Sequence, residues 1–138
     1  EKKGSEKISG ENPALICGSY LGQDFGFRLY DAAVSFETLH HLSHAGKRSI
    51  CSAVREAWQE GGVCLERDFA AASPEEEKSL YAENNRLRRE QNIRKGELCS
   101  FDTPCTSENE IALLKEAGFR SAEKIWQQGN TALTAAGK

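Results

Sequence analysis

The chain of 138 residues has the length of one domain, which can bury a core without help from metal ions or disulfide bonds. Its net charge of -3 and pI near 5.7 argue against nucleic acid or an acidic membrane as the main partner, because both need concentrated positive charge. The sequence has no apolar run of membrane-spanning length, and its charged amino terminus lacks the apolar core of a signal peptide. We therefore expect a soluble, cytoplasmic protein.

The five cysteines form an odd set with no CxxC pair and no spacing typical of a metal site. We expect reduced thiols, with Cys17 and Cys64 packed as small hydrophobic residues within apolar runs. No motif around any of them supports a catalytic thiol.

Residues 1–12 are charged and interrupted by glycine and serine, which is typical of a loop or a frayed helix end that continues a preceding segment. Pro13 then introduces a short predicted strand over 14–17, followed by a turn over 18–22. The next strand begins at Tyr30, where a run of small apolar residues predicts a strand covered on both faces. This strand stops in a polar turn, and in an open α/β sheet such a turn lies at the ligand crevice.

Apolar residues on helical spacing predict a helix over 47–59, which the pair Gly61-Gly62 would end. A strand over 63–66 follows, and its exit is again polar. A strand, a helix and a strand at this spacing predict a right-handed parallel crossover.

Ser73 and Pro74 form a helix start signal with a capping box, and they predict a helix over 74–91. This helix carries few large apolar residues, so we expect it to lie over a site or along the rim of the domain. Thr106 or Ser107 caps a further helix, which Gly118 ends. Two last strands are predicted over 119–126 and 131–136, joined by a turn.

Three histidines lie within five positions of the polar turn: His40, His41 and His44. On a helix His40 and His44 would share a face, which is half of a possible zinc site. No third ligand stands at a matching distance and no HExxH pattern occurs, so we expect no metal. The alternative for each histidine is a capping or hydrogen-bonding role near a helix start.

The run "YDAAVSFETLHHL" over 30–42 resembles the fourth-strand motif of class I S-adenosylmethionine-dependent methyltransferases. Other segments are similar to the family's motifs and follow in its order. They are "ICGSY" at the end of its third strand, "EGGVCL" at the turn into its fifth strand and "LLKEAGF" in the helix before its sixth strand. The resemblance runs from about Pro13 to the carboxyl terminus, which makes 13–138 the carboxyl-terminal portion of such a domain.

The resemblance implies an α/β fold, a partial Rossmann-like methyltransferase sheet with strands 3-4-5-6-7 of the seven-stranded fold. It also implies flanking helices and a helical lid inserted over 73–105. The family's glycine-rich loop and the acidic residue that binds the ribose have no counterpart in this sequence. In the family's strand order, 3-2-1-4-5-7-6, the absence of strands 1 and 2 exposes strand 4 as an apolar edge. We therefore expect low stability for this chain alone, and self-association or completion by another chain through that edge.

The resemblance also implies site residues. His40 and His41 are the expected catalytic residues, and His40 would point toward the acceptor, where an imidazole can take up a proton. The residues expected at the cofactor S-adenosylmethionine are Ser19, Tyr20, Ser35, Phe36 and Glu37, although Ser19 replaces an acidic residue of the family. The expected substrate contacts in the lid are Tyr81, Asn85 and Arg88, and exposed helix polarity is the alternative for each.

Arg86, Arg88 and Arg89 form a basic cluster that is flanked by Glu83 and Glu90, which is typical of a solvated helix face with internal ion pairs. For the whole chain we expect methyl transfer to a small-molecule acceptor, incomplete because the glycine loop is absent. The alternative is a noncatalytic α/β binding or partner module derived from a methyltransferase.

Overall fold

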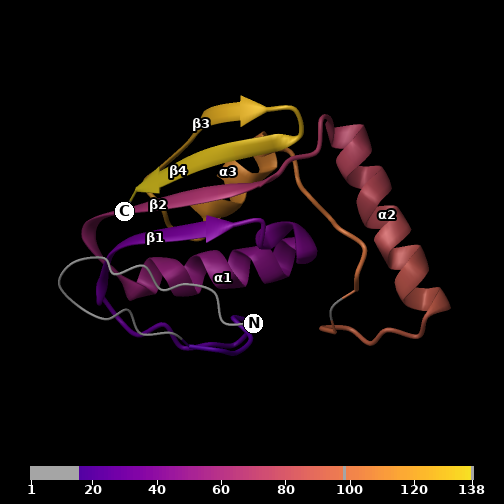
Figure 1. Ribbon diagram of the computed structural model, residues 1–138, viewed down its shortest axis with the longest axis horizontal. Coiled ribbons are helices and arrows are strands. Elements are labelled where there is room, and N and C mark those ends of the chain that lie inside the picture. Colours follow the sequence, from indigo (N-terminus) through magenta and orange to yellow (C-terminus); the bar gives the residue numbers. More distant parts are fainter. Residues whose placement is uncertain (1–15, 98, 138) are drawn as a thin grey trace, which may run out of the picture.

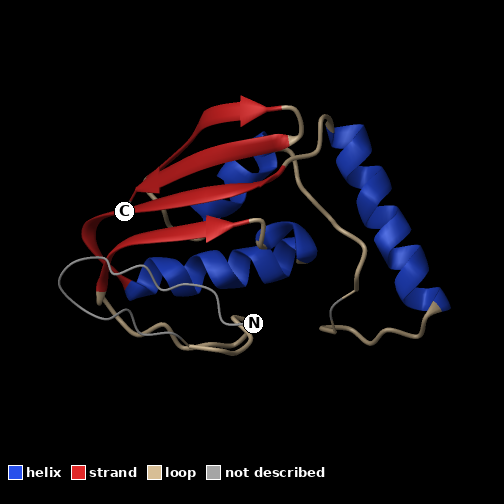
Figure 2. Cartoon of the chain, viewed as in Figure 1, coloured by secondary structure: helices blue, strands red, loops and turns tan. Residues whose placement is uncertain are grey.

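The computed structural model describes residues 16–97 and 99–137, which form one four-stranded sheet with helices packed against it (Figure 1). The sheet order is β1-β2-β4-β3, with β1 parallel to β2 and the other neighbours antiparallel. Helix α2 stands apart from the sheet, beyond the strand ends (Figure 2). No helix in 16–97 or 99–137 is long and apolar enough to cross a membrane. The elements are β1 (Tyr30–Phe36), the 3-10 turn η1 (Leu39–His41), α1 (His44–Ala57), β2 (Trp58–Phe69), α2 (Pro74–Glu90), α3 (Ser107–Glu116), β3 (Ser121–Gln128) and β4 (Thr131–Gly137).

The predicted α/β class is confirmed, and the sheet holds four of the five expected strands. Its order matches strands 4-5-7-6 of the methyltransferase fold. The strand expected over 14–17 lies half outside the described residues, while Ile16 and Cys17 belong to no strand. Within the described chain β1 is therefore the edge strand of the sheet.

The expectation that β1 is covered on both faces is wrong. Val34 is 56% exposed and Phe36 is 61% exposed, although both are large and apolar. Only β2 pairs with this strand among the described residues, so its outer edge and much of one face have no cover. An apolar edge of this kind is a template for pairing with another strand.

Helix α1 begins at Ser43, whose Oγ accepts a hydrogen bond from Gly46 N at 3.2 Å. The predicted glycine terminus is wrong, because α1 ends at Ala57 and Trp58 already belongs to β2. Trp58 is fully buried against Phe119, with ring centroids 5.2 Å apart, and this burial draws the chain into the sheet. The two glycines lie inside β2, where its pairing with β1 shifts register, as in a β-bulge.

The capping signals of α2 and α3 are confirmed. Ser73 Oγ accepts a hydrogen bond from Glu76 N at 3.1 Å, and Glu76 Oε2 accepts one from Ala72 N at 2.5 Å. Thr106 is the cap of α3 and its Oγ1 accepts from Asn109 N at 3.2 Å. Both helices therefore start where local sequence predicts.

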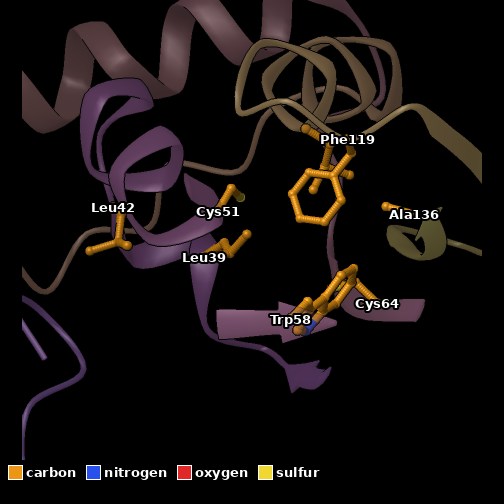
Figure 3. Packing of buried hydrophobic residues seen from close by; sticks show 8 residues of the cluster. Leu39, Leu42, Cys51, Trp58, Cys64, Phe119 and Ala136 are labelled. Carbon is orange, nitrogen blue, oxygen red and sulfur yellow. The ribbon is translucent and has the colours of Figure 1, made fainter. Parts of the chain in front are cut away.

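The hydrophobic core lies between the sheet, α1 and α3, with Trp58 and Phe119 at its centre (Figure 3). Cys51 and Cys64 pack in it, and burial raises the pKa of each thiol to about 12. At neutral pH these thiols are protonated packing groups. Cys17, in contrast, is exposed, so the expectation that it packs in an apolar run is wrong. Among the described residues Cys17 lies outside the strands of the sheet.

Two buried carboxyl groups lie between β2, β4 and α3. Glu66 is 3% exposed and Glu110 is 7% exposed, and the Oε1 atom of each has no hydrogen-bond partner among the described residues. Burial disfavours the charged form, with a smaller contribution from the Asp68 charge, and raises the pKa of Glu66 to about 8 and that of Glu110 to about 7. Both side chains therefore carry protons in the folded chain at pH values where exposed carboxyl groups are ionised.

Stability should fall as pH rises from about 4.5 to about 8, because the folded state binds more protons than the unfolded state in this window. Above the folded pKa of Glu66 the contribution of this residue is lost and the curve flattens. Glu66→Gln, which cannot ionise, should reduce the slope, whereas Glu60→Gln at an exposed position should not. Urea unfolding between about pH 5 and pH 9 measures this, and identical slopes in Glu66→Gln and the wild type would refute the assignment.

The exposed β1 edge should make the chain associate at rising concentration, with a melting temperature that depends on protein concentration. Val34→Lys should weaken association because a charge on an edge opposes strand pairing. Ile125→Lys, at a half-exposed position on the opposite edge strand β3, is the matched control. Sedimentation velocity tests this, and a high, concentration-independent melt of a monomeric wild type would contradict it.

Candidate functional site

The site lies where the parallel strands β1 and β2 end at the same edge of the sheet, the usual crevice for ligands in such folds. η1 follows β1 directly and carries His40 and His41. Asp68 stands near the end of β2 on the buried side of that strand. The parallel pairing of two strands thus brings a histidine and an aspartate together from positions 28 residues apart.

His40 is 3% exposed and held on several sides. Its backbone N–H donates to Asp68 Oδ2 at 2.8 Å, and its Nδ1 forms a short hydrogen bond with Asp68 Oδ1. Its carbonyl accepts from Thr103 N at 2.6 Å, and its ring meets the Phe69 ring edge-on at 4.9 Å. Because a carboxylate can only accept, Nδ1 carries the proton and the lone pair is left on Nε2.

Asp102 lies beside both histidines of η1. Its Oδ1 is 3.0 Å from His41 Nδ1 and its Oδ2 is 3.9 Å from His40 Nε2, while the two imidazole rings are 3.9 Å apart. His41 and Asp102 are about half exposed, so this side of the pair faces solvent. His40 thus lies between a buried carboxylate and an exposed one.

The side chains of His40, His41 and Asp102 have ligand atoms within 4.8 Å of one another, which is close enough to hold a metal ion. The sequence pattern showed no third ligand, and Asp102 supplies one from 61 residues away. Hydrogen bonding between His41 and Asp102 accounts for the arrangement without an ion, and exposed acidic groups commonly hold no ion.

His44 belongs to a different contact. Its Nε2 is 2.7 Å from Glu77 Oε1 and its ring stacks on Tyr81 at 4.3 Å, so it joins the start of α1 to α2. Burial alone would raise the pKa of Glu77, but hydrogen bonds from Thr106 N, Asn109 Nδ2 and His44 lower it. His44 therefore fits the hydrogen-bonding alternative rather than a metal pair with His40.

Lys47 places a buried ammonium group next to the site. It is 2% exposed, and its Nζ donates to Leu42 O at 2.9 Å, to Tyr81 Oη at 2.8 Å and to Thr103 O. Burial lowers the pKa of Lys47 from its usual value. All three N–H donors are used, and they tie α1, α2 and the segment after α2 together.

A cavity of about 530 Å³ lies between η1, α2 and the segment after α2. His41, Tyr81, Asn85 and Arg88 all line it, so the structure brings one expected catalytic residue and the three expected substrate contacts to one space. His40 does not line the cavity and lies behind His41.

The basic cluster of α2 divides into two parts. Arg86 pairs with Glu83 and Glu90, as expected for a solvated helix face. Arg88 and Arg89 instead line the cavity, where Arg88 donates to Asn84 Oδ1, Arg94 O and Glu97 O. The ion-pair interpretation is therefore right for Arg86 and wrong for Arg88.

Of the five residues expected at the cofactor, three line a common cavity and two do not. Tyr20, Ser35 and Phe36 line a second cavity of about 420 Å³ along β1. Ser19 and Glu37 do not line it: Ser19 Oγ accepts from Leu21 N at 3.1 Å, and Glu37 forms an ion pair with Arg67 at 2.5 Å.

Sequence reasoning missed Asp68, Asp102 and Lys47. One signal was present, since Glu66 and Asp68 are acidic at alternate positions on the inward face of a strand, where charged residues are rare unless they have a role. Asp102 and Lys47 follow no local pattern.

The sequence matches no protein-family model and no curated protein at a significant level. Solved structures do match. SibL, an S-adenosylmethionine-dependent methyltransferase in its apo form, superposes with a TM-score of 0.63 at 15% identity over 89% of this chain and 35% of its own. A putative O-methyltransferase from Nostoc punctiforme gives 0.62 at 17% identity over 89% and 35%, and human N-acetylserotonin methyltransferase with SAM gives 0.60 at 14% over 88% and 32%.

The chain thus spans about a third of the length of these solved proteins. Its strand order is the one that the resemblance implies for the carboxyl-terminal part of such a domain, and the superpositions show a shared fold over about a third of these chains. The described chain has the partial Rossmann-like fold of the class I S-adenosylmethionine-dependent methyltransferases.

Proposed function

We propose that the chain forms the acceptor side of a methyltransferase that moves a methyl group from S-adenosylmethionine to a hydroxyl group of a small molecule. The observation that carries this proposal is the buried pair of His40 and Asp68 beside a cavity at the ligand edge of the sheet. A histidine oriented by a carboxylate is the arrangement that general-base chemistry needs.

The proposed proton transfer depends on which ring nitrogen of His40 carries the proton. Asp68 keeps the proton on Nδ1, so Nε2 of His40 would accept the proton of the acceptor hydroxyl. The hydroxyl oxygen would bond to the methyl carbon as the bond from that carbon to the donor sulfur breaks, which leaves a neutral thioether. The imidazolium that results lies between the carboxylates of Asp68 and Asp102, which stabilise its charge. Because the His41 ring lies between His40 and the cavity, the His41 ring would move aside or would itself contact the acceptor.

The residues along β1 fit the methyl donor in part. Tyr20, Ser35 and Phe36 would form one wall of its site, with an aromatic and apolar lining and one hydroxyl group. Glu37, the residue after β1, pairs with Arg67 through Oε1 and does not line this cavity. When bound, S-adenosylmethionine would supply an electrophilic methyl group. The structure of human N-acetylserotonin methyltransferase, one of the similar proteins, contains SAM, which supports the choice of donor.

The second candidate is a noncatalytic binding or partner module with the same fold. The exposed apolar edge of β1 favours it, because a sheet that ends on Val34 and Phe36 can be completed by another chain. Binding of the methyl donor distinguishes the two candidates.

Isothermal titration with S-adenosylmethionine should show binding in the micromolar range if the chain retains a donor site. Phe36→Ala should weaken this binding by roughly fivefold, since an aromatic contact contributes about 1 kcal/mol. Phe27→Ala, at an exposed position outside the β1 cavity, is the control. Absence of binding at about 1 mM donor would favour the partner module.

His40→Ala should lower methyl transfer to phenolic acceptors by about 10² to 10⁴-fold, the usual contribution of a general base. Asp68→Asn should act through His40, lowering the rate and changing the pH profile while donor binding stays constant. His44→Ala, which removes only the contact with Glu77 and Tyr81, should keep a near wild-type rate. Release of S-adenosylhomocysteine measures the rate, and an undiminished rate in His40→Ala would exclude His40 as the base.

A further inference from the structure

The charged residues that line the cavity of about 530 Å³, called the acceptor cavity below, are mainly basic, although the protein as a whole is acidic. Arg88, Arg89 and Lys95 line it with a single carboxylate, Glu97, whereas the chain has a net charge of -3. Glu97 Oε2 accepts a hydrogen bond from Arg94 N at 3.0 Å. A cavity with this balance attracts anions.

The cations at this cavity are bound to neutral groups. Arg88 donates to the side-chain oxygen of Asn84 and to two backbone carbonyls, and Lys47 below the cavity wall donates to a phenol and two carbonyls. Within 16–97 and 99–137 no carboxylate forms an ion pair with Arg88, Arg89, Lys95 or Lys47. Glu77, which acts on Lys47 at longer range, is held by its own hydrogen-bond donors.

Arg86 on the same helix shows what a neutralised arginine looks like in this chain. Its guanidinium contacts Glu83 through two hydrogen bonds and Glu90 through a third, on the face that does not line the cavity. In α2, Arg86 is therefore paired with two carboxylates, whereas Arg88 and Arg89, which line the cavity, form no ion pair within the described residues. Positive charge is thus directed into the acceptor space.

The spacing along α2 gives the size of the ligand. Tyr81 is at the His41 end of the cavity, since its hydroxyl and the carbonyl of Leu42, the residue after His41, both accept from Lys47 Nζ. Arg88 follows seven residues later. A helical rise of 1.5 Å per residue places the two about 10 Å apart. A molecule that reaches from the histidines to the arginines would have its two polar ends separated by up to about this distance.

We propose that the acceptor is an anionic small molecule, whose carboxylate or phosphate group binds Arg88 and Arg89 while its hydroxyl group lies at the His41 end of the cavity. Guanidinium groups suit both anions because their N–H donors match paired oxygens. Which atom is methylated rests on the function proposed above, whereas anion binding does not.

The test compares three probes that differ in the group opposite a phenol: 4-hydroxycinnamate, 4-hydroxyphenylethyl phosphate and the neutral 4-hydroxycinnamamide. Binding to the full chain is measured by nuclear magnetic resonance titration without a methyl donor. At least one anion should bind roughly tenfold more tightly than the amide at low salt, and the difference should shrink at about 0.3 M salt. The tighter anion identifies the carboxylate or the phosphate as the preferred group.

Arg89→Gln and Lys95→Gln should each reduce the anion preference, and Arg86→Gln is the matched control on α2 outside the cavity lining. Arg88→Gln should reduce the anion preference most. Because Arg88 also binds the segment after α2, the nuclear magnetic resonance spectrum of this variant must show that it is folded. Equal binding of amide and anions, no binding of any probe, or an equal loss in Arg86→Gln would overturn the proposal. If the anion preference is present but S-adenosylmethionine does not bind, the proposed function fails and the anion site stands.

Discussion

The ammonium group of Lys47 holds the site together. It donates to the turn after β1, to α2 and to the segment after α2, through Leu42, Tyr81 and Thr103. Removing an ammonium group from water costs several kcal/mol, and hydrogen bonds from a charged donor each contribute about 1.5–3 kcal/mol. The buried position is stable because every N–H of the ammonium has an acceptor. An apolar side chain in its place would leave the Thr103 carbonyl without a donor among the described residues, whereas the Leu42 carbonyl also accepts from Thr103 Oγ1 at 3.0 Å.

Thr103 connects Lys47 to His40 through hydrogen bonds. Its carbonyl accepts from Lys47, while its N–H donates to the carbonyl of His40 and its hydroxyl donates to the carbonyl of Leu42. Asp68 fixes the other side of His40 through the backbone and the ring. The orientation of the histidine thus depends on β2, on α1 and on the segment that follows α2. The acceptor cavity and the proposed base are parts of one hydrogen-bonded unit.

Local signals predicted the elements that local chemistry determines. Ser73 and Thr106 cap α2 and α3 because their side chains bond to N–H groups three residues away. Gly61-Gly62 was misinterpreted as a helix end, because burial of Trp58 places the glycines in a bulge. The exposure of β1 depends on which strands are its neighbours, and that is not encoded in its own residues. Asp68 and Asp102 meet the histidines across 28 and 61 residues, so no local spacing could predict that site.

Helix α2 supplies no residue to the hydrophobic core of the described chain, and its contacts with the rest are hydrogen bonds, one ring stack and the Lys47 ammonium. Separation of α2 from the sheet would exchange these bonds for bonds to water and would expose little apolar surface. Because the heat capacity of a transition follows apolar exposure, such an opening would have almost no heat-capacity change. Its equilibrium would then respond nearly linearly to temperature, unlike the curved response expected for unfolding of the hydrophobic core.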